Sequence, residues 1–320
     1  MAGPTGGGEF ALIRRILALR RVVPEALTVD AGDDCAVFAA APLAVGNDLS
    51  VEGVHFRREW LSPAEIGFRA AGAALSDLAA MAAEPIAVLL ALCLDEAADT
   101  EDALALARGV IDAAEAVGAG LAGGDIARGP MLALDVVAIG RCATPVRRGG
   151  ALAGDRLWVT GRLGGAARAV RAWREGTEPT PAARAAFATP RPRVAEARWL
   201  AERGARALID LSDGLSCDCA HLAGASGLEA ALDATAIPVD TAAGAALEDA
   251  LHGGEDYELL LAAPPGSIED AAPAFHERFG VPLTAIGVVR AGSGVYLRGV
   301  DGRERPLPRG GFDHLGGMPA

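Results

Sequence analysis

This 320-residue chain carries acidic residues in six short segments that lie outside regular charged helix faces, and most of these segments contain or adjoin glycine. The segments are residues 32–35, 47–48, 75–78, 123–125, 209–214 and 253–257. Carboxylate oxygens are ligands that hard cations prefer, and glycine lets a phosphate approach the backbone closely. Six such clusters exceed what solvation of the surface requires. The pattern therefore indicates a site for metal ions and phosphate groups.

The overall composition indicates an acidic, globular protein of two domains. The chain is long for one hydrophobic core, and 51% of its residues are hydrophobic. A net charge of −13 without a basic tract argues against nucleic acid as a partner. No apolar stretch is long enough to cross a membrane, and the first residues do not resemble a signal peptide. We therefore expect a cytoplasmic protein whose five scattered cysteines are reduced thiols.

All 29 basic residues are arginine, and the chain contains no lysine. A phosphate-binding loop of the GK[ST] type and Schiff-base chemistry both need lysine, so the sequence excludes both. If the chain handles ATP, then metal ions, arginines and backbone N–H groups must hold the phosphates.

Hydrophobic periodicity places strands and helices alternately in both halves of the chain. The sequence Ser-Pro-Ala-Glu at 62–65 combines a capping box with proline at the first helical position, and predicts a helix start. Further predicted elements are strands at 86–94, 131–141 and 207–211 and helices at 101–117 and 215–224. The pattern predicts an α/β (α+β) fold with helices covering a sheet in each of two domains, residues 1–148 and 149–320.

The sharpest candidate site is the segment 209–214. Strand, acidic turn and helix follow one another, which places Asp210 and Asp213 at the carboxyl end of a strand, where ligands of α/β sheets gather. Ser212 between them can hydrogen-bond a phosphate or nucleotide oxygen. The alternative is a cluster that caps the following helix, for which one aspartate would suffice.

Other segments carry weaker signals. Asp77 lies within an apolar helix, where a carboxylate is costly unless it is paired, metal-bound or on a solvent face. Asp34, Asp48 and Asp125 each fit a tight turn as well as a metal ligand. The glycines at 161–165 precede a helix and could bind an anion.

His55 and Arg148 each have a structural and a functional interpretation. A lone histidine between apolar residues is commonly structural, and an arginine in a turn is commonly exposed. A guanidinium at position 148 could equally meet a phosphate.

Taken together, in this order and at these separations, the segments resemble thiamine-monophosphate kinase. The matching blocks are Gly8-Glu9-Phe10, Gly32-Asp33-Asp34-Cys35, Glu52-Gly53-Val54-His55-Phe56, Leu75-Ser76-Asp77-Leu78-Ala79-Ala80-Met81, Gly123-Gly124-Asp125, Ile209-Asp210-Leu211-Ser212-Asp213-Gly214-Leu215 and Gly253-Gly254-Glu255-Asp256-Tyr257-Glu258-Leu259. The match runs from Gly8 to about His314. Single blocks also occur in relatives such as aminoimidazole ribonucleotide synthetase, selenophosphate synthetase and a hydrogenase maturation factor.

The resemblance implies ATP-dependent phosphorylation of thiamine monophosphate to thiamine diphosphate, the last step of thiamine diphosphate biosynthesis, with Mg²⁺. It implies a homodimer whose N-terminal domains pair through their sheets. It also implies that the C-terminal domain completes an active-site cleft.

Carried over residue by residue, the resemblance assigns the site. It implies metal ligands at Asp34, Asp48, Asp77, Asp125, Asp210 and Asp213, of which Asp125, Asp210 and Asp213 are the expected catalytic residues. It implies ATP contacts from Gly124, Asp125, Arg148 and Ser212. It implies contacts to the thiamine phosphate from His55, Glu255 and Phe312.

One segment departs from the family pattern. Where the family often has two hydroxyl residues before the aspartate that matches Asp48, this chain has Gly46 and Asn47. A hydroxyl contact to the metal is lost there, whereas the amide oxygen of Asn47 can still serve as a ligand.

The expected chemistry suits these residue types. The acceptor is a phosphate monoester, largely ionised at neutral pH (second pKa about 6), so no general base is required. Magnesium ions held by carboxylates, together with Arg148, would neutralise two anions and align an in-line transfer. The alternatives are another ATP-dependent synthetase of the same superfamily and a catalytically silent nucleotide- or metal-binding protein. The lack of lysine argues against a selenophosphate synthetase.

Overall fold

The computed structural model describes residues 15–29, 37–39, 42–308 and 310. The chain divides into two compact units. The N-terminal unit comprises residues 1–78, 83–143 and 188–192, and the C-terminal unit comprises residues 79–82, 144–187 and 193–320. The main change of unit falls at 143/144, five residues before the predicted domain boundary at 148/149.

The N-terminal unit is built on a four-stranded sheet in the order β3-β6-β4-β5. The strands are β3 (Leu43–Val51), β4 (Glu84–Leu94), β5 (Gly120–Arg128) and β6 (Ala133–Arg141). β6 runs antiparallel to both of its neighbours, β3 and β4, whereas β4 and β5 are parallel. A separate two-stranded sheet pairs β1 (Leu27–Val29) with β2 (Val37–Phe38).

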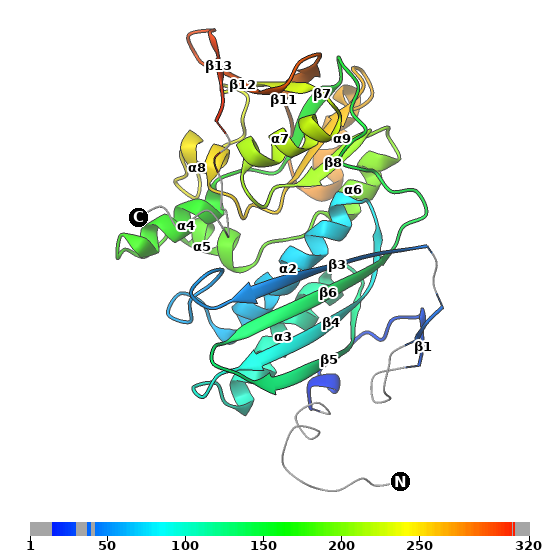
Figure 1. Ribbon diagram of the computed structural model, residues 1–320, viewed down its shortest axis with the longest axis vertical. Helices are drawn as coiled ribbons and strands as arrows, with labels where there is room; N and C mark the ends of the chain where they lie inside the picture. Colours follow the sequence, from blue (N-terminus) through cyan, green and yellow to red (C-terminus); the bar gives the residue numbers. More distant parts are fainter. Residues whose placement is uncertain (1–14, 30–36, 40–41, 309, 311–320) are drawn as a thin grey trace, which may run out of the picture. The chain divides into compact units, whose positions relative to one another are not determined.

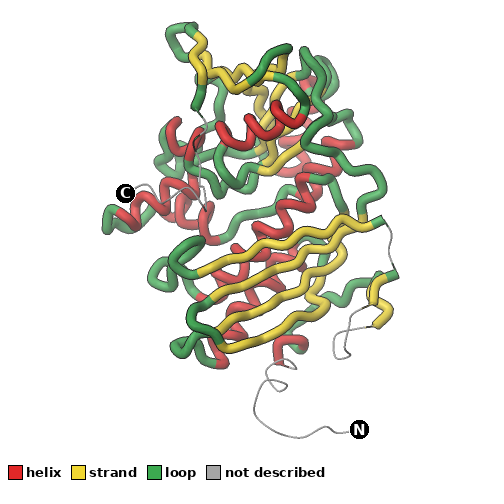
Figure 2. Tube along the Cα trace, viewed as in Figure 1, coloured by secondary structure: helices red, strands yellow, loops and turns green. Residues whose placement is uncertain are grey.

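Two helices, α2 (Pro63–Ala80) and α3 (Thr100–Ala116), cover one face of this sheet (Figures 1 and 2). The predicted capping box forms at the start of α2, where the Glu65 carboxylate accepts hydrogen bonds from the Ser62 N–H at 2.8 Å and the Ser62 hydroxyl at 2.7 Å. Glycines let the helices touch, since a Cβ on Gly67 or Gly109 would overlap a carbonyl oxygen of the other helix.

The opposite face of the sheet carries no described helix of the N-terminal unit. Along β3 the exposed and half-buried positions alternate, as the two-residue period of a strand requires. Three of the four exposed residues are apolar: Leu43, Val45 and Leu49 are 42%, 62% and 52% exposed, and the fourth is Asn47. Large apolar residues exposed together on a sheet face are typical of a surface that packs against a partner.

The C-terminal unit is built on a seven-stranded sheet in the order β13-β12-β9-β11-β7-β10-β8. Its strands are β7 (Arg156–Thr160), β8 (Ala207–Asp210), β9 (Glu229–Asp233), β10 (Leu259–Ala263), β11 (Leu283–Arg290), β12 (Gly294–Arg298) and β13 (Glu304–Pro306). All neighbours are antiparallel except β9 and β12. β8 lies at the edge of this sheet and pairs antiparallel with β10, and Asp210 stands at its carboxyl end, as the sequence predicts.

Helices of this unit are α4 (Gly165–Arg174), α5 (Pro181–Ala188), α6 (Val194–Ala201), α7 (Leu215–Ala225), α8 (Leu247–His252) and α9 (Ala272–Phe279). α7 packs on the sheet and on α8. Its apolar residues, such as Leu215 and Leu222, join the buried core with Leu157 and Ile286 of the strands. This packing fixes the turn that joins β8 to α7, which carries the sharpest candidate site.

Candidate active site

The predicted succession of strand, acidic turn and helix at residues 207–225 is confirmed. β8 ends at Asp210, whose residue surface is only 7% exposed, and α7 begins at Leu215 after Gly214. Gly214 has φ +108°, a conformation that favours glycine. Ser212 and Asp213 lie half-buried in the turn between them.

A second loop holds this turn from the far end of the sequence. The N–H of Glu255 donates to the Ser212 carbonyl at 2.8 Å, and the N–H of Tyr257 donates to the Leu211 carbonyl at 2.8 Å. A Cβ on Gly254 would lie 2.5 Å from the Ser212 oxygen, so only glycine allows this approach. The structure thus brings Asp210, Ser212, Asp213 and Glu255 into one region of the C-terminal unit.

Asp218, which the sequence reasoning missed, supports the same turn from inside α7. Its carboxylate accepts hydrogen bonds from the N–H groups of Asp213 and Gly214, both at 3.1 Å. Burial, and next the negative charges of Asp210 and Asp213, raise the pKa of Asp218 to about 8. The sequence signal that could have indicated Asp218 is its position in the first turn of the predicted helix, close after Asp213.

The donor set of this turn fits a magnesium ion. Asp210 and Asp213 supply oxygen ligands only, which Mg²⁺ prefers. Burial is the main reason why the pKa of Asp218 is raised, and the negative charges of Asp210 and Asp213 beside it add to the shift. A divalent cation at the turn would neutralise that charge.

The glycine turn at 161–165 binds a carboxylate of the protein itself. The N–H of Gly164 donates to both oxygens of Asp256, at 2.9 and 3.1 Å. Burial of that carboxyl raises the pKa of Asp256 well above its ordinary value. This loop–carboxylate contact ties the start of α4 to the 253–257 loop.

In the N-terminal unit, Asp77 projects from α2 toward β3. A Cβ on Gly46 would lie 3.4 Å from the Asp77 Oδ2 atom, an ordinary contact distance. Asp48 shares the face of Gly46, because residues two apart in a strand point the same way. Asp77 is exposed, although Ser76 and Leu78 beside it are buried. The burial cost expected for its carboxylate therefore does not apply.

Asn47 and Asp125 lie on the other face of the same sheet. Asp125 of β5 and Asp135 of β6 both stand opposite Ala91 of β4, and opposite residues share a face. The Asn47 amide donates to Asp135 Oδ1 at 3.3 Å. A shallow cavity of about 190 Å³ lies between Asp125 and Asp135. Asp135 was not among the predicted residues.

Gly124 and His55 have clear local roles. A Cβ on Gly124 would overlap the Leu90 carbonyl oxygen of the adjacent strand, so the pairing of β5 with β4 requires glycine here. The N–H of Val51 donates to His55 Nδ1 at 3.0 Å, which leaves the ring proton of the neutral form on Nε2. His55 is half-buried just beyond the end of β3.

The remaining predicted residues are exposed or outside the description. Arg148 is exposed in the C-terminal unit. Asp34 and Phe312 lie outside the described residues.

Comparison with protein families identifies both halves of the chain. Residues 32–142 match the AIR synthase related protein, N-terminal domain, and residues 153–300 match the AIR synthase related protein, C-terminal domain. The chain is therefore a two-domain AIR synthase related protein.

Relatives narrow this class. The thiamine-monophosphate kinase of Mycobacterium tuberculosis is 35% identical over 266 residues, 79% of this chain and 80% of the relative. The crystal structure of thiamine-monophosphate kinase from Stenotrophomonas maltophilia is similar with a TM-score of 0.81 and 36% identity, over 92% of this chain and 97% of that one. AaThiL complexed with AMPPCP and TMP matches with a TM-score of 0.75 and 28% identity, over 98% and 99% of the two chains. The chain belongs to the thiamine-monophosphate kinase family.

This membership confirms the predicted family, fold class and enzyme class. Within the part of the chain that is described, no helix is both long and apolar enough to cross a membrane.

Proposed function

We propose that this kinase transfers the γ-phosphoryl group of ATP directly to the phosphate of thiamine monophosphate, assisted by Mg²⁺. The ATP-dependent phosphorylation of thiamine monophosphate is the activity of the family to which the chain belongs. The observation that supports the magnesium assignment is the Asp210–Asp213 turn. Its two aspartates supply oxygen ligands, and a divalent cation would neutralise their negative charge.

In the C-terminal unit, Asp210 and Asp213 hold magnesium on the ATP phosphates, and Ser212 contacts the nucleotide. The backbone bonds from Glu255 and Tyr257 keep the turn in place, so its carboxylates need little rearrangement on binding. Glu255 itself contacts the thiamine phosphate, and Arg148 is available to pair with a phosphate.

In the N-terminal unit, Asp48 and Asp77 form a candidate pair of ligands on one face of the sheet. Asn47, which donates to Asp135, and Asp125 are two separate candidate ligands on the other face. Gly124 lets a phosphate approach the backbone beside Asp125, and His55 can donate through Nε2 to the thiamine phosphate. Asp34 and Phe312 keep their predicted roles as a metal ligand and a substrate contact.

The acceptor explains why the described site needs no strong general base. A phosphate monoester is already ionised at neutral pH, so the nucleophilic oxygen carries no proton to remove. The obstacle is repulsion between two anions. Magnesium supplies the charge that neutralises it, and the protein residues fix the two phosphates in line.

The test supplies ATP and magnesium with either thiamine monophosphate or free thiamine as acceptor. Thiamine diphosphate should form only from the monophosphate, and EDTA should stop the reaction. Asp213→Asn should lower turnover by at least ~10²-fold, the scale of single electrostatic contacts. Asp233→Asn, on a surface strand end, is the matched control and should retain activity. Efficient turnover of free thiamine, or full activity of Asp213→Asn, would overturn the proposal.

We also infer that two copies pair through the helix-free face of the β3-β6-β4-β5 sheet. The exposed Val45 and Leu49 on this face support the inference, because pairing would remove them from water. We further infer a cytoplasmic enzyme. The four described cysteines are free thiols, which a reducing compartment maintains.

A further inference from the structure

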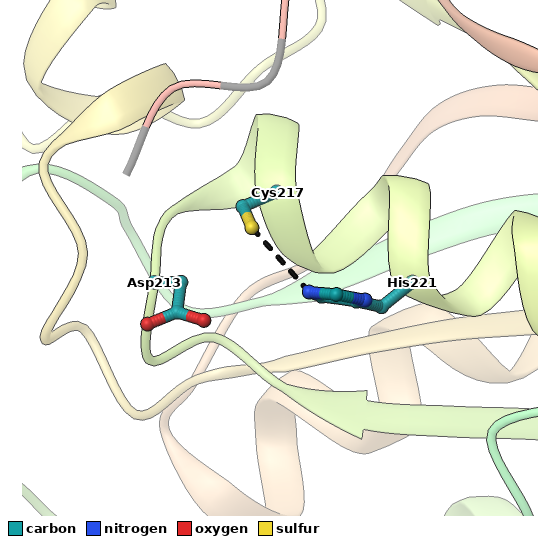
Figure 3. A group of neighbouring side chains, drawn as sticks. All are labelled: Asp213, Cys217 and His221. Atoms are coloured by element: carbon teal, nitrogen blue, oxygen red, sulfur yellow. Dashed lines mark hydrogen bonds between the residues drawn. The ribbon is translucent and has the colours of Figure 1, made fainter. Parts of the chain in front are cut away.

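Three side chains of different chemistry meet at the start of α7 (Figure 3). Asp213 comes from the turn before the helix, and Cys217 and His221 come from its first and second turns. One ligand atom from each lies within 4.8 Å of those from the other two. In Figure 3 the carboxylate, the sulfur and the near ring nitrogen face a common space. All three residues are half-buried, so the space is open to solvent on one side.

The helix itself brings Cys217 and His221 together. Residues four apart lie one above the other on the same face of a helix. The Sγ atom of Cys217 and the Nε2 atom of His221 are 3.5 Å apart. The backbone of α7 places the two residues on one face, and their side-chain rotamers give this separation in the absence of a ligand.

That separation fits a tetrahedral zinc ion. With a Zn–S distance of about 2.3 Å and a Zn–N distance of about 2.0 Å, a tetrahedral angle separates the sulfur and nitrogen by about 3.5 Å. The Asp213 oxygen needs to approach by up to about 1.4 Å to reach its own ligand distance. A rotation of the Asp213 side chain provides a movement of this size, and solvent can fill the fourth position.

The ligand set selects the class of metal. A thiolate and an imidazole suit Zn²⁺, Co²⁺ and similar ions, whereas magnesium prefers oxygen ligands and keeps its waters. Cys217 and His221 therefore add nothing to magnesium binding but add two strong ligands for zinc. Asp213 alone can belong to both kinds of site.

We propose that Asp213, Cys217 and His221 form an inhibitory site for a zinc-class divalent cation. The ion binds the Cys217 thiolate, the His221 imidazole and one Asp213 oxygen, and the thiol proton passes to solvent on binding. Occupation withdraws Asp213 from the magnesium on the ATP phosphates, so the kinase stops. The binding depends only on the three side chains, whereas the inhibition rests on the proposed function of Asp213.

The binding is tested with Co²⁺ on the reduced, metal-free full chain without substrates. Wild type should bind one equivalent with a thiolate-to-cobalt charge-transfer band. Cys217→Ser should lose the band, and His221→Ala should weaken binding by at least ~10-fold. Cys142→Ser is the matched control, because Cys142 is also half-buried. No band in wild type, a band that survives Cys217→Ser, or unchanged affinity in His221→Ala would overturn the site.

A second measurement uses only the wild-type chain, so it does not depend on whether the variants fold. Stoichiometric zinc should protect Cys217 from alkylation in the wild-type chain while leaving Cys142 as reactive as before, read by peptide mass spectrometry. Equal alkylation of Cys217 with and without zinc would overturn the site.

The inhibition is tested in the kinase assay at saturating magnesium and ATP. Zinc should inhibit wild type at the concentration at which it binds, and Cys217→Ser should keep its basal activity and require at least ~10-fold more zinc. Equal sensitivity of the two proteins would overturn the inhibition. A wild-type chain that binds cobalt but has no kinase activity would overturn the proposed function, while the binding result would still support the metal site.

Discussion

Replacing Asp218 by asparagine should stabilise the magnesium-free protein at neutral and alkaline pH. The residue is 2% exposed, and burial, with the charges of Asp210 and Asp213, raises the pKa of its carboxyl to about 8 from an ordinary value of 3.8. Between these two values the unfolded chain releases the proton while the folded chain keeps it. The folded state therefore binds more protons, and the free energy of unfolding falls as the pH rises through this window.

The magnitude follows from the width of the window. Each pKa unit corresponds to about 1.4 kcal/mol, so at pH 7 the carboxyl costs on the order of 4 kcal/mol relative to a group that does not titrate. Asparagine can accept the same hydrogen bonds from the N–H groups of Asp213 and Gly214. Fitting its amide group costs about 1 kcal/mol, the scale of one hydrogen bond. We expect a net gain of about 3 kcal/mol at pH 7.

Urea denaturation between pH 5 and pH 8.5, in EDTA, measures this gain. The difference between Asp218→Asn and wild type should grow with pH up to about pH 8 and then level off. Asp233→Asn provides a control of opposite sign. Hydrogen bonds from Thr235 and Arg298 lower the pKa of Asp233, so its charge stabilises the fold at neutral pH and its loss should destabilise it. The reasoning fails if Asp218→Asn is no more stable than wild type at pH 8, or if the difference is independent of pH.

Three further predictions concern other parts of the molecule. Val45→Arg should convert the inferred dimer to monomers in analytical ultracentrifugation, whereas Val300→Arg, at a position 91% exposed, should not; a dimeric Val45→Arg protein would contradict the sheet interface. Gly46→Ser places a hydroxyl beside Asp77 and should lower the magnesium concentration for half-maximal activity several-fold, while Gly46→Ala should not change it. If the two variants change this concentration equally, the hydroxyl binds no metal. Glu258→Gln removes the buried carboxylate to which the half-buried Arg193 donates at 2.8 Å, and leaves Arg193 only the more distant Glu196, at 3.5 Å. The change should lower the free energy of unfolding by about 3 kcal/mol in urea denaturation, and a loss below about 1 kcal/mol would show that the pair is not needed.

Local signals predicted the elements of this fold well. The capping box at residues 62–65, the helix at 101–117 and the turn before the helix at 215–224 depend on neighbours in the sequence, and the structure confirms each. The pairing of strands depends on contacts across the chain. The mostly antiparallel order of the seven-stranded sheet, with β8 at its edge, could not be read from alternating strands and helices.

The environment of individual carboxylates was harder to predict. For Asp77 the sequence left pairing, metal binding and a solvent-facing position open, and the structure shows it as the one exposed position among residues 70–79. A helix rich in alanine has no clear polar face, so its periodicity does not show which residue meets solvent. The opposite case is Asp218, which the sequence did not single out and which is buried under the turn that it supports.

The pairing of glycine with acidic residues has a structural cause as well as a chemical one. Gly254 allows its loop to approach the Ser212 carbonyl, and Gly124 allows β5 to approach Leu90, at distances that no other residue tolerates. Each close approach of two backbones brings the acidic residue that follows the glycine, Glu255 or Asp125, to a place set by the other segment. Glycine in these motifs therefore does more than leave room for phosphate. It allows segments distant in the sequence to lie in contact, which places Glu255 beside the turn at Ser212 and Asp125 beside β4.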